Sequence, residues 1–234
     1  MTGTHPPRII GHRGASGSAH ENTLEAFRRA QELGANAVEL DIHASQDGTL
    51  LVHHDPDVAG VGRIAELHAT AFADYRLPNG EPIPTLAQVL ALIPGIDIWV
   101  EVKTLTPKHD ALLLETLRTG PNPPCYAVHS FDHRIIRRLG DAEPTLRRGV
   151  LLASYLCETL PVLAAAGADT LWMETHLIDQ ALVELIHEDE LRLIAWTAND
   201  EREIERLIHL GVDGICGNHP DRIQAALART RGGR

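Results

Sequence analysis

The sequence predicts an α/β fold of the (β/α)8 barrel type. Three observations favour this class: eight short apolar segments alternate with eight helix-like segments, glycines mark several of the helix ends, and a length of 234 residues suits one barrel. An open, doubly wound sheet is the alternative, because it uses the same alternation of strands and helices.

The predicted strands are short runs rich in Ile, Val and Leu, as expected for buried strands. They cover residues 8–11, 37–42, 97–102, 125–129, 147–152, 170–174, 191–197 and 212–216. The predicted helices cover residues 22–33, 86–92, 108–118, 132–139, 157–165, 179–188, 200–209 and 220–228. Gly34, Gly140, Gly167 and Gly211 lie just past four of these helices, where a helix end favours a residue that accepts positive φ.

One segment interrupts the alternation. Residues 49–84 hold a short apolar run, then His53 and His54, then a stretch rich in Gly and Pro. We therefore expect a single domain over residues 1–234, with an insertion at about 49–84 between the second and third barrel strands. The insertion follows the carboxyl end of a strand, which is where barrel enzymes carry their chemistry.

The charge balance limits the class of partner. The chain has 21 Lys and Arg against 32 Asp and Glu, a formal net charge of −11, which argues against nucleic acid or an anionic membrane surface as a partner. No segment approaches the roughly 18 apolar residues of a membrane span, and residues 1–8 contain no apolar stretch. We expect a cytoplasmic protein with a small-molecule partner; the sequence predicts no particular oligomeric state.

Carboxylates gather near the ends of two predicted strands. Glu39 and Asp41 come at the end of the second strand, and Glu101 and Lys103 at the end of the third. Side chains two residues apart on a strand point to the same side, so each pair can face the mouth of the barrel.

Three converging carboxylates favour a metal site, because like charges at close range need a cation between them. Oxygen ligands suit Mg²⁺ or Ca²⁺, with Mn²⁺ as a further candidate. The alternative is a structural network in which Glu39 and Glu101 pair with Arg13 and Lys103; two acidic pairs on adjacent strands favour the metal.

Arg13 and Lys103 beside a metal would form a positive site suited to a phosphate or phosphodiester. Cleavage of a phosphodiester needs a base for the attacking oxygen and an acid for the leaving oxygen, and histidine serves both roles near neutral pH. Among 14 histidines, His12 and His54 stand out, because His12 precedes Arg13-Gly14 and His54 precedes Asp55.

Several short motifs occur in a fixed order along nearly the whole chain. They are His12-Arg13-Gly14, Glu21-Asn22-Thr23, Glu39-Leu40-Asp41, Asp47-Gly48, His54-Asp55, Ile83-Pro84-Thr85-Leu86, Glu101-Val102-Lys103, Ser130-Phe131-Asp132, Trp196-Thr197-Ala198-Asn199 and Gly211-Val212-Asp213-Gly214-Ile215. In this order they resemble the glycerophosphodiester phosphodiesterase family. One departure is Asn218, which stands where the family usually has Asp after the last strand.

The resemblance implies a barrel, a divalent cation, and hydrolysis of a glycerophosphodiester to sn-glycerol 3-phosphate and an alcohol such as choline or ethanolamine. It implies an acid–base role for His12 and His54. The remaining positions that it implies are the metal ligands Glu39, Asp41 and Glu101, the phosphate-binding residues Arg13 and Lys103, and Trp196 near the glycerol moiety.

Three alternative functions remain open at this point. A lysophospholipase D-type phosphodiesterase would need an apolar surface for an acyl chain. A non-catalytic phosphate-binding barrel would be expected to lack a histidine or a ligand. A zinc hydrolase would favour His-x-His after the first strand, where this chain has His12-Arg13-Gly14.

Overall fold

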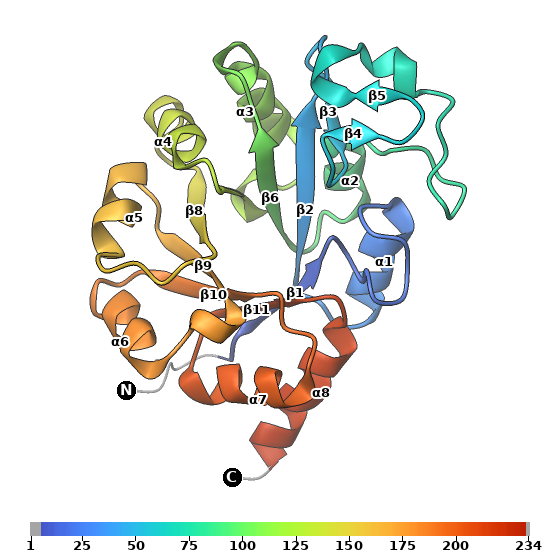
Figure 1. The fold of residues 1–234 in the computed structure, drawn as a ribbon. Coiled ribbons are helices and arrows are strands. Elements are labelled where there is room, and N and C mark those ends of the chain that lie inside the picture. Colours follow the sequence, from blue (N-terminus) through green and yellow to red (C-terminus); the bar gives the residue numbers. More distant parts are fainter. Residues whose placement is uncertain (1–5, 233–234) are drawn as a thin grey trace.

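Eight parallel strands close into a barrel in the computed structural model, which describes residues 6–232. The barrel strands are β1 (Arg8–His12), β2 (Ala37–Ala44), β6 (Asp97–Thr104), β7 (Tyr126–Ser130), β8 (Arg147–Leu152), β9 (Thr170–Glu174), β10 (Arg192–Trp196) and β11 (Gly214–Gly217). Their order is β1-β11-β10-β9-β8-β7-β6-β2, and β1 also pairs with β2, which closes the barrel (Figure 1). The (β/α)8 prediction is confirmed, and the open sheet is excluded.

Helices surround the strands (Figure 1). They are α1 (Leu24–Glu32), α2 (Leu86–Leu92), α3 (Asp110–Thr119), α4 (His133–Ala142), α5 (Leu160–Ala166), α6 (Gln180–Glu188), α7 (Glu201–Leu210) and α8 (Pro220–Gly232). Gly34, Gly167 and Gly211 have positive φ, as predicted. The prediction for Gly140 is wrong: it lies inside α4, where a Cβ would come within 2.7 Å of the Arg148 guanidinium.

Several helices start later than expected, and two of them show the physical reason. Helix α1 begins after Thr23, whose side chain accepts a hydrogen bond from the backbone N–H of Ala26, while Asn22 has a φ of 56°. Helix α5 begins at Leu160 instead of residue 157, with Pro161 in its first turn. Local capping and proline therefore set these boundaries more than apolar periodicity does.

The insertion packs against β2 and around a small apolar core of its own. Strand β3 (Leu50–Val52) pairs antiparallel with β2 from Ile42 to Ala44. The rest contains the hairpin of β4 (Asp57–Val58) and β5 (Gly62–Arg63) and the 3-10 turns η1 (Ile64–Glu66) and η2 (Ala69–Phe72). The small core of the insertion consists of Leu51, Val58, Ile64, Phe72, Leu77 and Ile83.

Strand β2 continues to Ala44 because β3 supplies it with a hydrogen-bonding partner. Glu39 and Asp41 consequently lie within β2 and not at its end, which corrects the expected position. Residues 1–5, 233 and 234 lie outside the described residues, including most of the N-terminal segment used for the location prediction. Within residues 6–232 no helix combines the length and the apolar character needed to cross a membrane.

Candidate active site

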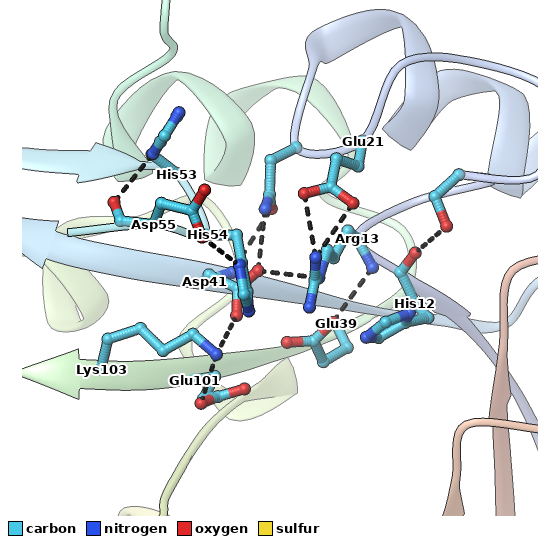
Figure 2. Close-up of polar contacts among 12 residues, drawn as sticks. His12, Arg13, Glu21, Glu39, Asp41, His53, His54, Asp55, Glu101 and Lys103 are labelled. Atoms are coloured by element: carbon cyan, nitrogen blue, oxygen red, sulfur yellow. Dashed lines mark hydrogen bonds and ion pairs between the residues drawn. The ribbon is translucent and has the colours of Figure 1, made fainter. Parts of the chain in front are cut away.

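Glu39, Asp41 and Glu101 converge inside the barrel, as predicted. Asp41 on β2 lies opposite Glu101 on β6, and one carboxylate oxygen from each of the three residues lies within 4.8 Å of the others. All three side chains are buried. Figure 2 shows them gathered with Arg13 and Lys103 across adjacent strands.

The two predicted cations contact these carboxylates. Nζ of Lys103 lies 3.0 Å from Oδ1 of Asp41 and 2.7 Å from Oε1 of Glu101. Nε of Arg13 lies 3.1 Å from Oδ2 of Asp41, and its Nη1 bonds Glu21 at 2.9 Å. An ion-pair network, which was the alternative to a metal site, is therefore present. Its acidic members are mainly Asp41 and Glu101, whereas the alternative had named Glu39 and Glu101.

Glu39 is left incompletely paired. Its Oε2 accepts the backbone N–H of Arg13 at 3.0 Å, but its buried Oε1 has no hydrogen-bond partner among the described residues. If all three buried carboxylates are ionised, the two cations leave one negative charge uncompensated, which is unfavourable in a low-dielectric interior. The orphaned oxygen and the oxygen-only donor set fit a hard divalent cation.

Burial perturbs the pKa values of the triad. Burial, with Asp41 and Glu101 adding to it, raises the pKa of Glu39 well above its usual range. Burial followed by the charge of Asp41 raises the pKa of Glu101 to about 7. Burial opposes ionisation of Asp41 too, but Lys103, Arg13 and the Asn22 amide outweigh it and lower the pKa of Asp41. The permanent negative charge of the site therefore rests on Asp41.

A tight turn after β1 aims Arg13 into the site. Arg13 and Asn22 have φ values of 54° and 56°, and the backbone N–H of Asn22 donates to the Arg13 carbonyl at 3.0 Å. Gly14 has a φ of 81°, and a Cβ there would lie 2.6 Å from the Ala26 backbone, so the turn requires glycine. The Asn22 amide donates to Oδ2 of Asp41 at 2.8 Å. Sequence reasoning assigned Asn22 no role, although the Glu-Asn-Thr motif contains it.

His12 lies at the end of β1 beside this turn. Its Nδ1 is 2.7 Å from the Oδ1 of Asn218, an acceptor, so Nδ1 donates and Nε2 is left with its lone pair. Burial, and next the charge of Arg13, lower the pKa of His12. His12 is thereby oriented by a residue 206 positions away in the chain.

His54 reaches the site through backbone contacts of the insertion. The backbone N–H of His53 donates to the Asp41 carbonyl at 3.1 Å, and Nε2 of His43 donates to the His54 carbonyl at 3.0 Å. The half-exposed ring of His54 bonds Oδ1 of Asp55 through Nδ1 at 2.8 Å. In Figure 2, His12 and His54 lie on different sides of Arg13. His43 was missed, although it continues the two-residue spacing of Glu39 and Asp41.

Trp196 ends β10, at the same end of the barrel but away from the triad. Its ring packs edge-on against Phe131, with centroids 5.5 Å apart, and Phe131 is 49% exposed. Trp196 also packs against the buried apolar cluster inside the barrel, which includes Trp99 and Trp172.

His129 is a second buried histidine that sequence reasoning did not single out. It lies on β7 opposite Glu101 of β6, and its Nε2 is 3.9 Å from Oε1 of Glu39. Burial lowers the pKa of His129 to about 3, so its imidazole is neutral. Its position on the strand after Glu101, facing the same interior, is the signal that could have found it.

A closed (β/α)8 barrel with buried carboxylates, cations and histidines toward the carboxyl ends of its strands defines a barrel enzyme with a candidate cation and phosphate site. The model of the glycerophosphoryl diester phosphodiesterase family matches residues 12–222. The chain belongs to this family, which confirms the resemblance drawn from its motifs.

A relative agrees with this placement, and solved structures agree with the fold. The chain is 31% identical over 229 residues to a glycerophosphodiester phosphodiesterase of Caldanaerobacter subterraneus, covering 91% of this chain and 94% of that one. It is similar in fold to a phosphodiesterase of Oleispira antarctica in complex with the product sn-glycerol-3-phosphate, with a TM-score of 0.86, 24% identity, and coverage of 95% and 97%. A putative glycerophosphoryl diester phosphodiesterase of Silicibacter pomeroyi gives a TM-score of 0.87 at 24% identity, with coverage of 98% and 96%.

Proposed function

We propose that this protein hydrolyses glycerophosphodiesters to sn-glycerol 3-phosphate and an alcohol, with a divalent cation held by Glu39, Asp41 and Glu101. The observation that carries the proposal is the buried carboxylate triad with its orphaned Glu39 oxygen, in a chain of this family. Choline and ethanolamine are the leaving alcohols we expect. Mg²⁺, Ca²⁺ and Mn²⁺ are the candidate cations, and a cytoplasmic location remains a prediction.

Arg13 and Lys103 are proposed to bind the phosphoryl group. When bound, a divalent cation supplies a Lewis acid that offsets negative charge on the phosphoryl oxygens. Its charge would compensate Asp41 and Glu101, which now hold Lys103 at 3.0 and 2.7 Å. The Lys103 ammonium would then be free to donate a hydrogen bond to a phosphoryl oxygen of the substrate. The planar guanidinium of Arg13 would donate further hydrogen bonds to the same group.

His12 and His54 are proposed to divide the proton transfers. His12 is held through Nδ1 by a neutral amide, so its Nε2 lone pair is available to take the proton of the attacking oxygen. His54 has the Asp55 carboxylate at Nδ1, the partner that a protonated imidazole needs when it gives a proton to the leaving alkoxide. We therefore assign the base to His12 and the acid to His54; water or a neighbouring substrate hydroxyl can be the attacker.

A turnover screen tests the reaction. The protein is assayed against glycerophosphocholine, glycerophosphoethanolamine and related diesters, first with EDTA and then with Mg²⁺, Ca²⁺ or Mn²⁺ added back. We expect sn-glycerol 3-phosphate to be released, with activity lost in EDTA and restored by a cation. Full activity in EDTA would remove the cation from the proposal, and no release of sn-glycerol 3-phosphate from any diester would reject the reaction.

Leaving-group chemistry tests the two histidines. His12→Ala and His54→Ala should each lower kcat on an alkyl diester by at least about 100-fold. The leaving oxygen of a 4-nitrophenyl diester needs no acid. On this substrate the kcat of His54→Ala should return toward that of wild type, whereas the kcat of His12→Ala should stay low. His209→Ala, on the outer helix α7, is the control and should match wild type. The reverse pattern would exchange the two roles, and near-wild-type kcat in both variants would reject them.

A lysophospholipase D-type activity is the second candidate, favoured by the exposed Phe131 beside Trp196 at the rim. An acyl chain would find an apolar contact there. Parallel assays on lysophosphatidylcholine and glycerophosphocholine separate the two substrates. Higher kcat/KM on the deacylated diester would reject this candidate.

A further inference from the structure

The ring of His129 is fixed in place inside the barrel by aromatic packing. Its centroid lies 4.1 Å from that of Trp172 and 5.7 Å from that of Trp99. Gly149 leaves the room for this arrangement, because a Cβ there would lie 2.9 Å from Cδ1 of Trp172 and 3.2 Å from Cβ of His129. The imidazole is thus held at a defined position beside Glu101 and Glu39.

Polar atoms face one another there without partners. His129 is 1% exposed, and neither of its ring nitrogens has a hydrogen-bond partner among the described residues. Oε1 of Glu39 is also buried and unpartnered, and it lies 3.9 Å from Nε2 of His129. This distance is too long for a direct hydrogen bond but suits one bridging water or a small approach of the two groups.

Packing alone does not account for a histidine at this position. A phenylalanine would fill the same space between the two tryptophans without burying two unpartnered nitrogens, which is unfavourable. Glu39 meanwhile is held on one side only, because the Arg13 backbone reaches its Oε2 and no described residue reaches its Oε1. A donor directed at Oε1 would complete the orientation of this carboxylate.

We propose that His129 is a positioning residue for the cation site: its Nε2–H donates to Oε1 of Glu39, directly or through one water, and holds this carboxylate in the orientation that binds a divalent cation. The inference rests on the proposed cation role of Glu39. Donors behind a ligating group commonly fix its orientation and strengthen metal binding in this way. In this role His129 acts through Glu39 and takes no part in the proton transfers.

Two variants and a control separate this role from packing. His129→Phe keeps a ring between the tryptophans and removes both nitrogens. His129→Gln keeps an N–H donor with similar reach. Tyr126→Phe is the matched control, because it removes a polar atom from the other end of the same strand, where the Tyr126 hydroxyl accepts the backbone N–H of Asn122 at 3.0 Å.

The main readout is Mn²⁺ affinity of the full chain by calorimetry, without substrate, together with Tm in EDTA. His129→Phe should weaken Mn²⁺ binding by about 10- to 100-fold, with Tm in EDTA unchanged or raised. His129→Gln should restore most of the affinity, and Tyr126→Phe should bind as wild type. At saturating Mn²⁺, kcat of His129→Phe should return toward the wild-type value.

Wild-type Mn²⁺ affinity in His129→Phe would overturn the inference. Equal weakening in the Phe and Gln variants, with Tm in EDTA lowered in both, would overturn it too, because it would show a packing role. The proposed function fails separately: a wild type that binds Mn²⁺ but hydrolyses no glycerophosphodiester would reject the reaction and leave the role of His129 standing.

Discussion

Two regions of the site hold their functional groups in different ways. One is the wall, formed by β2 and β6, and the other is the insertion that follows β2. On the wall, register places Asp41 opposite Glu101, and ion pairs to Lys103 join the two strands. In the insertion, His54 depends on its carbonyl contact with His43 and on the exposed Asp55. The charged groups are thus fixed by the sheet, whereas one proton-transfer group is fixed by a loop.

This difference separates two properties that experiments can measure. Cation affinity should depend on the wall, and turnover at saturating cation should depend on the insertion. Changes to the carboxylate triad should therefore lower cation affinity, and changes to the contacts that position His54 should leave that affinity unchanged. Four predictions test this separation.

The largest effect is expected for Glu39→Gln on the wall. The amide keeps the shape of the side chain but removes the charge that a cation needs, so kcat/KM should fall about 1,000-fold or more. Burial raises the pKa of Glu39 and favours its protonated form without a cation, so Tm in EDTA should change little. Asp97→Asn, at the other end of β6, is the control: it should lower Tm, because Asp97 pairs with Arg8 at 2.7 Å, and leave kcat/KM unchanged. More than a tenth of wild-type activity in Glu39→Gln would contradict the assignment.

A smaller effect is expected for His43→Phe. His43 lies on β2, but its Nε2 donates to the His54 carbonyl, so the change removes a contact that positions the insertion. The acid should then be misplaced, and kcat should fall by about 10-fold or more. Because the triad is untouched, Mn²⁺ affinity measured by calorimetry should stay at the wild-type value. His68→Ala, in the insertion, should change neither quantity. A loss of affinity as large as the loss of kcat would show that the two regions are not separable.

The pH dependence of cation binding sharpens the account of the wall. Burial and Asp41 raise the pKa of Glu101 from 4.5 to about 7, so below pH 7 a cation must displace its proton. Affinity should fall roughly 10-fold per pH unit for each proton displaced between pH 7 and 5.

The same shift gives Glu101 a pH-dependent share of the stability of the cation-free protein. A carboxyl whose pKa is raised on folding binds more protons when folded, so the stability that Glu101 contributes in EDTA should be lost as the pH rises from 4.5 toward 7. Calorimetry at several pH values checks the affinity. Thermal unfolding of wild type and Glu101→Gln in EDTA isolates the contribution of Glu101 from that of His129, whose lowered pKa acts in the opposite direction below pH 6.5. Equal cation affinity at pH 5.5 and 7.5 would contradict the raised pKa of Glu101.

The smallest effect is expected for Asn218→Asp. A carboxylate in place of the amide 2.7 Å from Nδ1 should raise the pKa of His12 and move the acid limb of the kcat/KM profile up by about one pH unit. Below pH 7 the variant should have a lower kcat/KM than wild type, and at pH 8 the two proteins should have the same kcat/KM. Asn36→Asp, at a side chain that is bonded to the Ile9 backbone near the start of β1, should leave the profile in place. An unmoved acid limb in Asn218→Asp would show that His12 is not the titrating base.

The wall was predictable because two rules suffice for it. Alternation places Glu39 and Asp41 on one side of a strand, and the closed order of the barrel brings β6 beside β2. Strand and helix positions followed apolar patterning in the same way. Gly140 shows the limit of this reasoning, because its place inside α4 depends on Arg148, which packs over it from β8.

The remaining site residues depend on contacts that no local pattern encodes. The ring of His12 is oriented by Asn218, which is 206 positions away in the sequence. The side chain of His43 holds the backbone carbonyl of His54, and the role of His54 could be expected only from the family motif. The ring of His129 is positioned by two tryptophans that belong to two other strands.

The hydrogen bond between His12 and Asn218 joins residues 206 positions apart, across the strands that close the barrel. During synthesis the ribosome releases His12 long before Asn218. A nascent chain that extends only through β10 already contains both histidines and all three carboxylates, yet the ring of His12 still lacks its orienting partner. Catalytic competence should therefore appear late in translation, after β11 has joined β1.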